Sequence, residues 1–108
     1  MNTEELQVAA FEIILNSGNA RSIVHEAFEA MREGKYDLAT EKLKASNEEL
    51  LKAHQAQTDL LQEYACGTEI NVEMKMEIIM VHAQDHLMTT MTLREVALEM
   101  LELYKIVG

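Results

Sequence analysis

The amino-acid sequence predicts an all-α protein, an antiparallel bundle of three helices in a single domain over residues 1–108. Its composition has no proline and only four glycines, while alanine, leucine, methionine, glutamate and lysine, all good helix formers, are abundant. Apolar residues recur at steps of three and four, the spacing of one helix face. A chain of 108 residues is long enough for one domain and too short for two. We expect helices over about 3–32, 37–66 and 70–106.

The first helix, about 3–32, is predicted from its caps and from one continuous apolar seam. Asn2 and Glu5 have the spacing of a capping box, and Gly34 is suited to follow the last turn. Gly18 lowers helix propensity inside the pattern, which indicates either close packing against a neighbour, the commoner reason, or a kink. The seam at steps of four and three is Leu6, Ala10, Ile13, Ser17, Ala20, Val24, Ala27 and Met31.

The second helix, about 37–66, follows a very short turn, so it should run antiparallel to the first. Asp37 offers a cap at its start, and Gly67 supplies the next break. Within it, His54, Gln57 and Thr58 form a polar island beside the apolar seam. The seam is Ala39, Leu43, Ser46, Leu50, Ala53, Gln57, Leu60 and Tyr64.

The third helix, about 70–106, is apolar almost all the way round. One seam is Met76, Ile79, Ala83, His86, Thr90, Leu93, Ala97, Met100 and Tyr104, and a second stripe is Ile78, His82, Asp85, Thr89, Thr92 and Val96. A helix that is apolar on every side must be buried on every side, which two partner helices cannot achieve. The sequence therefore predicts oligomerisation through this helix, with the second stripe near a symmetry axis.

Charge and cysteine content restrict the function classes. Nine basic and 19 acidic residues give a formal charge of −10, which disfavours nucleic acids and anionic lipid surfaces. No apolar run approaches the roughly 20 residues that cross a bilayer. The single cysteine, Cys66, cannot form an intrachain disulfide, and no signal peptide opens the chain, so we expect a cytoplasmic protein.

The chemistry is concentrated in residues 81–90 of the third helix. His82, Asp85 and His86 share one helix face, because positions three and four apart are neighbours. Three interpretations remain open for them: a metal site within one chain, an imidazole nucleophile that accepts and passes on a group, or histidines without chemistry. The Glu-x-x-His pair of di-iron bundles is absent. Spacing alone does not decide among these.

Three motifs make the chain resemble a known family. They are residues 16–22 (NSGNARS), Ala53-His54 with Gln57-Thr58, and residues 81–88 (VHAQDHLM). The chain resembles the enzyme IIA component of the lactose/cellobiose family of the sugar phosphotransferase system, over nearly its whole length. The resemblance implies a three-helix bundle that assembles as a homotrimer, in agreement with the apolar third helix.

The resemblance also implies a phosphoryl carrier. His82 would take a phosphoryl group from HPr and pass it to a cysteine of the cognate IIB, for uptake of a β-disaccharide of the cellobiose, chitobiose or lactose class. Asp85 matches an aspartate at the trimer axis, where three copies share one structural Mg²⁺. His54, Gln57, Gln84 and His86 match family motifs, which implies a supporting role. The alternative is a non-catalytic regulatory or scaffolding bundle, and the sugar itself cannot be identified from this component.

Overall fold

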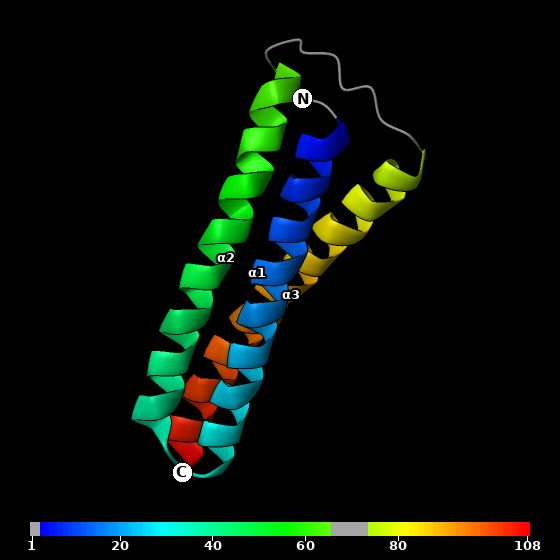
Figure 1. Cartoon of the computed structure of the whole chain (residues 1–108). Helices are drawn as coiled ribbons and strands as arrows, with labels where there is room; N and C mark the ends of the chain where they lie inside the picture. The colour runs from blue at the N-terminus through cyan, green and yellow to red at the C-terminus, as the bar shows by residue number, and fades with distance from the viewer. Residues whose placement is uncertain (1–2, 66–73) are drawn as a thin grey trace.

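The computed structural model contains three long helices, in the order α1 (Thr3–Arg32), α2 (Tyr36–Ala65) and α3 (Met74–Val107). It describes residues 3–65 and 74–108. The chain reverses between α1 and α2, so α2 is antiparallel to the other two helices (Figure 1). The molecule is elongated, with principal extents of 54 × 23 × 15 Å. The predicted all-α class and the three-helix arrangement are confirmed over the described residues.

The core side of α1 is the one predicted from the sequence. All eight residues of its predicted seam are buried, from Leu6 to Met31. The N-terminal half of this seam packs in a cluster with Ala53 of α2 and with Ala83 and Leu87 of α3, and the C-terminal half packs with Leu43 and Leu101. The three helices therefore share one continuous core along their length.

A tight turn after Arg32 makes α1 and α2 a hairpin. Gly34 has a φ of +75°, a left-handed conformation that glycine adopts without strain. The amide of Gly34 donates to the carbonyl of Met31 (3.1 Å) and that of Lys35 to the carbonyl of Ala30 (2.9 Å), the two bonds of a Schellman cap. The predicted stop at Gly34 is confirmed, and α2 begins at Tyr36, one residue before the expected start.

The core stripe of α3 matches the predicted seam at Ala83, Thr90 and Ala97 and departs from it between these positions. Its fully buried residues are Ala83, Leu87, Thr90, Ala97 and Leu101, whereas His86, Leu93 and Tyr104 are half-buried. Leu87 and Leu101, which belong to neither of the two predicted stripes of this helix, thus lie in the core. The expected start of this helix at residue 70, the end of α2 at residue 66, and Cys66 lie outside the described residues.

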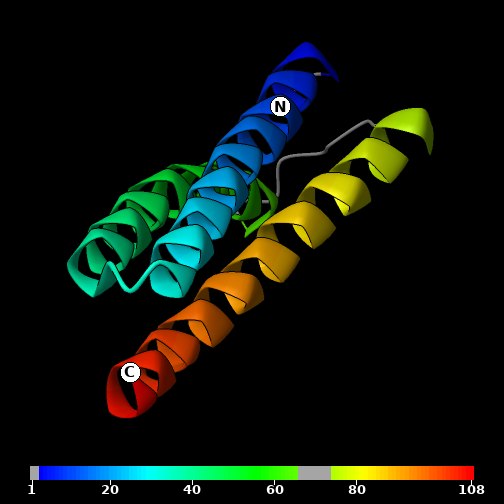
Figure 2. The ribbon, with the colours of Figure 1, turned by 90° about the horizontal axis from the view of Figure 1, so that it is seen from below.

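The side of α3 that faces away from α1 and α2 exposes large apolar residues. Val81, Met88 and Val96 are 61%, 53% and 47% exposed. Figure 2 shows that the first turns of α3 diverge from the α1–α2 pair. Among the helices in the described part of the chain, none is long and apolar enough to span a bilayer.

One expectation about Gly18 is wrong. A Cβ built at Gly18 would meet no atom within 4 Å, apart from its own helix backbone and chain neighbours. The glycine therefore does not serve close packing within this chain. The proposed capping role of Asn2 lies outside the described residues.

Candidate functional site

His82 and His86 form a pair on one edge of α3. The His82 side chain is exposed and that of His86 is half-buried. Their ring centroids are 6.1 Å apart, and the ring planes meet at 87°. The structure thus confirms that the spacing of four residues brings these imidazoles together, and it leaves His82 accessible to a reactant from solvent.

Two threonine side chains donate hydrogen bonds to backbone carbonyls next to this pair. Thr90 donates from Oγ1 to the carbonyl of His86 (2.7 Å), and Thr89 donates to the carbonyl of Asp85 (2.7 Å). The Nδ1 atom of His86 is buried without a hydrogen-bond partner in the described structure. A buried polar atom without a partner costs about 1–3 kcal/mol. This arrangement lowers stability, so packing alone does not explain a histidine at position 86.

Gln84 and His82 lie on opposite sides of the buried stripe of α3. We call these two sides the flanks of α3. Two residues along a helix rotate a side chain by about 200°, and Ala83 and Leu87 occupy the buried side between the two flanks. The Nε2 atom of Gln57, on α2, donates to Oε1 of Gln84. The flank with Gln84 therefore faces α2, and His82 lies on the flank toward α1.

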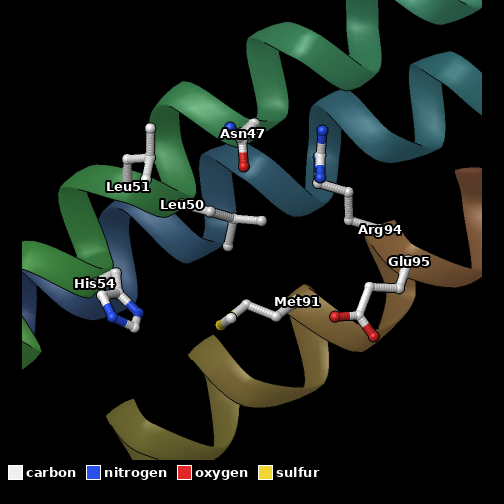
Figure 3. Close-up of a pocket in the computed structure, with 7 residues that line it drawn as sticks. All are labelled: Asn47, Leu50, Leu51, His54, Met91, Arg94 and Glu95. Carbon is white, nitrogen blue, oxygen red and sulfur yellow. The ribbon is translucent and has the colours of Figure 1, made fainter.

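His54 lines a cavity between α2 and α3 on this second flank. The cavity has a volume of about 260 Å³, and Figure 3 shows the His54 ring directed toward Met91 across it. The lining residues are Asn47, Leu50, Leu51, His54, Met91, Arg94 and Glu95. The predicted supporting residues thus divide into two groups: His86 stands beside His82, while Gln84, Gln57 and His54 lie on the side of α3 next to α2.

Arg94 is a residue that the sequence analysis did not identify. Its Nε atom donates to the carbonyl of Leu43 (3.0 Å) and to Oγ of Ser46 (3.1 Å), which joins α3 to α2. Partial burial lowers the pKa of this guanidinium, while nearby Glu95 opposes the shift. Arg94 is the only lysine or arginine between Lys75 and Lys105 in the sequence, and this isolated cation was the available signal for such an interhelical contact.

Asp85 lies on the outward side of α3, and its side chain is exposed. Within residues 3–65 and 74–108, no group of three or more His, Cys, Asp or Glu side chains could hold a metal ion. Carboxylate oxygens suit Mg²⁺, but a single carboxylate does not make a protein site. A cation at Asp85 would need carboxylates from further copies of the chain.

The sequence around His82 contains very few cations. Residues 1–20 and 79–93 include no lysine or arginine. Lys52 of α2 lies in the same part of the bundle, but its Nζ is 3.3 Å from a carboxylate oxygen of Glu49. Arg21, which directly follows the core residue Ala20 of α1, is exposed and is the first cation of that helix. Residues 79–93 of α3 thus offer no lysine or arginine of their own to an anion at His82.

Comparison with known proteins agrees with this fold. Residues 8–105 match the model of the family described as the lactose/cellobiose-specific IIA subunit of the phosphotransferase system. The chain belongs to this family, which confirms the resemblance found in the sequence. Its class is accordingly a phosphotransferase-system component.

Individual relatives cover nearly the whole chain. The lichenan-specific phosphotransferase enzyme IIA component of Bacillus subtilis (strain 168) is 45% identical over 102 residues, which are 94% of this chain and 89% of that protein. The crystal structure of PtcA from S. mutans is 83% identical with a TM-score of 0.90, over 97% of this chain and 99% of that one. A solution structure of a IIA(chitobiose)–HPr complex is 32% identical with a TM-score of 0.79, over 94% and 95% of the two chains.

Proposed function

We propose that this chain is a phosphoryl carrier that accepts a phosphoryl group from phospho-HPr on His82. It then transfers the group to a cysteine of a cognate IIB, during uptake of a β-disaccharide of the cellobiose, chitobiose or lactose class. The observation that carries the proposal is an exposed imidazole at the edge of the bundle, with a second imidazole beside it. The structural likeness to a IIA protein solved with HPr supports HPr as the donor.

The chemistry needs a neutral imidazole at His82. A ring nitrogen lone pair attacks phosphorus while the bond between phosphorus and the donor imidazole breaks, and the donor leaves with its electron pair restored. In the second step a thiolate of IIB attacks the same phosphorus and His82 is regenerated. Positioning and charge neutralisation carry most of such a transfer. His82 is nucleophile in the first step and leaving group in the second.

We also propose that the carrier is a homotrimer assembled through the outward side of α3. Val81, Met88 and Val96 are apolar and exposed there, and an apolar surface of this kind is typical of subunit contacts. In a closed ring, one flank of each copy meets the other flank of the next copy. The His82 flank of one subunit would then face the flank that carries Gln84, Gln57 and His54 in its neighbour, which would bring the supporting residues to the phosphoryl group.

In this trimer Asp85 would lie near the axis. Three clustered carboxylates repel one another unless a cation binds among them, and one Mg²⁺ would supply that neutralisation. The metal is structural in this proposal and takes no part in phosphoryl transfer.

The test of the carrier role is intact mass after incubation with phosphoenolpyruvate, enzyme I and HPr, followed by peptide mapping. We expect one acid-labile phosphoryl group per chain, located on His82. The His82→Gln variant should keep its helical content and accept no phosphoryl group. His25→Gln is the matched control, because His25 is an exposed histidine on α1, and it should be phosphorylated normally. A phosphorylated His82→Gln protein would contradict the assignment, and an unphosphorylated wild type with phosphorylated HPr would favour a scaffolding role.

The test of the axis is Asp85→Leu. Removing three mutually repelling carboxylates should eliminate bound Mg²⁺ and leave the trimer intact or more stable, because apolar groups replace charges in a subunit contact. Metal content by mass spectrometry and assembly mass by sedimentation measure the two effects. Dissociation of this variant into monomers would contradict the proposed position of Asp85.

A further inference from the structure

Ser17 is a polar residue in the core of the bundle, and the proposed function gives it no role. The buried polar residues of the described chain are Ser17, Ser46 and Thr90. Ser46 and Thr90 donate their hydroxyl protons to backbone carbonyls (2.7 Å each), whereas the Oγ atom of Ser17 has no hydrogen-bond partner. A buried hydroxyl without a partner costs stability, so its presence needs a physical explanation.

The core residues of α1 and α3 show which layer Ser17 occupies. These helices run in the same direction with the same rise per residue (Figure 1). Ile13 of α1 packs in one cluster with Ala83 of α3. Met31 packs in another with Leu101, and in both cases the residue numbers differ by 70. The buried residues of α1 that have a buried counterpart at this offset are Ile13 (Ala83), Ser17 (Leu87), Ala20 (Thr90), Ala27 (Ala97) and Met31 (Leu101). Ser17 is therefore level with Leu87, the residue after His86.

His86 contributes a second buried atom without a partner to this layer. Its Nδ1 atom and Oγ of Ser17 are the buried side-chain nitrogen and oxygen atoms that lack a hydrogen bond in the described part of the chain. His86 is on the flank of α3 toward α1, since the other flank is bonded to α2 through Gln84. Ser17 is on the side of α1 that faces the core. The two unpaired atoms therefore lie in one layer, between the same two helices.

The second ring nitrogen of His86 gives this pair of atoms a chemical use. Nε2 is not enclosed without a partner as Nδ1 is, and the centroid of the ring is 6.1 Å from that of His82. Phosphoryl oxygens accept hydrogen bonds, so His86 supports a phosphoryl group on His82 by donating from Nε2. A neutral imidazole that carries its proton on Nε2 can only accept at Nδ1. The hydroxyl of Ser17 can supply that hydrogen bond.

We infer that Ser17 is a positioning residue for phosphoryl transfer. Its hydroxyl donates to Nδ1 of His86 when a phosphoryl group is on His82, which holds the His86 ring in the tautomer with its proton on Nε2. The inference rests on the proposed function. In the unphosphorylated chain the two atoms are not bonded to each other, so the hydrogen bond is gained with the phosphoryl group and favours the state that contains it. Ser17 acts through His86 and does not contact the reacting atoms.

The experiment measures single-turnover transfer from phospho-HPr to the full chain, with the maximal rate and the half-saturating concentration of phospho-HPr determined separately. Ser17→Ala should lower the maximal rate about two- to tenfold, the effect of one hydrogen bond, and leave the half-saturating concentration within about twofold. The unphosphorylated variant should be as stable as the wild type or more stable, because a hydroxyl without a partner is removed. Ser17→Thr keeps the hydroxyl and should transfer faster than Ser17→Ala.

Two comparisons and one spectrum separate positioning from packing. In the His86→Leu background, Ser17→Ala should cause no further loss of rate, because the ring through which Ser17 acts is already missing. Ser46→Ala is the matched control: Ser46 is a buried serine of α2 whose hydroxyl is bonded to Leu43 and Arg94, so this variant should lose stability and keep its rate. The ¹⁵N NMR shifts of the His86 ring in the phosphorylated chain should show the proton on Nε2, and Ser17→Ala should show both tautomers.

Four results would overturn the inference. An unchanged maximal rate in Ser17→Ala, with the wild-type chain phosphorylated on His82, removes the role of Ser17 and leaves the carrier role intact. An equal loss of rate with and without the His86 ring shows that Ser17 does not act through it. A raised half-saturating concentration alone shows contact with the donor, and a proton on Nδ1 in the phosphorylated wild type excludes a hydrogen bond from Ser17 to that atom. If the wild type itself accepts no phosphoryl group, the proposed function fails first, and this result is distinct from the other four.

Discussion

The two flanks of α3 differ in how their polar side chains are held. Toward α2, Gln84 is bonded to Gln57 and Arg94 is bonded to two groups of the facing helix. Toward α1, His82 is exposed and the buried nitrogen of His86 has no partner in the described structure. Side chains that stabilise a fold have their hydrogen bonds satisfied, whereas unsatisfied or exposed groups of one chain are available to a reactant or a second subunit. The first flank therefore ties α3 to α2 by hydrogen bonds, and the second is the flank on which we propose that phosphoryl transfer takes place.

Replacement of His86 tests this difference most strongly. His86→Leu should lower the rate of phosphoryl transfer about 10- to 100-fold, because a positioned imidazole beside His82 is lost. The same change should leave the free energy of unfolding unchanged or raise it by up to about 1 kcal/mol, because a buried nitrogen without a partner disappears. Single-turnover transfer and denaturant unfolding measure the two effects, with His25→Leu as control. A variant that loses stability and keeps its activity would reverse the roles assigned to the flanks.

Replacement of Arg94 should have the opposite pattern. Arg94→Met removes a charged donor to two acceptors on α2, and should lower the free energy of unfolding by about 2 kcal/mol. Transfer to His82 in the folded protein should change less than about threefold. Lys105→Met is the control, because Lys105 makes an exposed ion pair with Glu102 at 3.8 Å, and such pairs contribute less than about 1 kcal/mol. Equal stability of the two variants would show that the contacts of Arg94 do not hold α3 to α2.

The Gln57–Gln84 pair should give the smallest effect on stability. A double-mutant cycle with Gln57→Ala and Gln84→Ala should yield a coupling energy of about 0.5–1 kcal/mol, since this is one neutral hydrogen bond. A zero coupling would mean that the bond does not persist in solution.

Mixed assemblies of Gln84→Ala chains and His82→Gln chains test where Gln84 acts. In such an assembly, each intact His82 can have an intact Gln84 only on a neighbouring subunit. Phosphoryl transfer above the level of Gln84→Ala alone would indicate that Gln84 acts on the neighbouring subunit's site.

The sequence predicted α1 better than α3, for a physical reason. In α1 the core side is apolar except at Ser17, and the opposite side is small or acidic beyond Leu15, so the period of 3.6 residues identifies the core side. In α3 the outward residues Val81, Met88 and Val96 are as apolar as the core residues Ala83 and Leu87, so the pattern could not show which stripe faces the other helices. The seam predicted for α3 was therefore right at Ala83, Thr90 and Ala97, and it missed the core residues Leu87 and Leu101.

The candidate site was predictable only where it is local. His82 and His86 are four residues apart, and helix geometry alone places them together. Gln57 and Gln84 are 27 residues apart in sequence, and the bond from Arg94 to Leu43 spans 51 residues. Such pairs depend on the register between two helices, which composition and periodicity do not specify. The prediction for Gly18 failed for the same reason. Close packing there required a neighbouring element, and periodicity does not show that the fold places none beside this residue.

The short turn at Gly34 has a consequence for the order of folding. It joins two helices of 30 residues each through three residues, so the entropy lost when their ends meet is small. Local pairing of this kind forms faster than contacts between distant segments. We expect the α1–α2 hairpin to form early and α3 to dock onto it afterwards. Helix α3, which carries His82 and His86, would then pack last. The contacts around His82 would therefore form only when folding is complete.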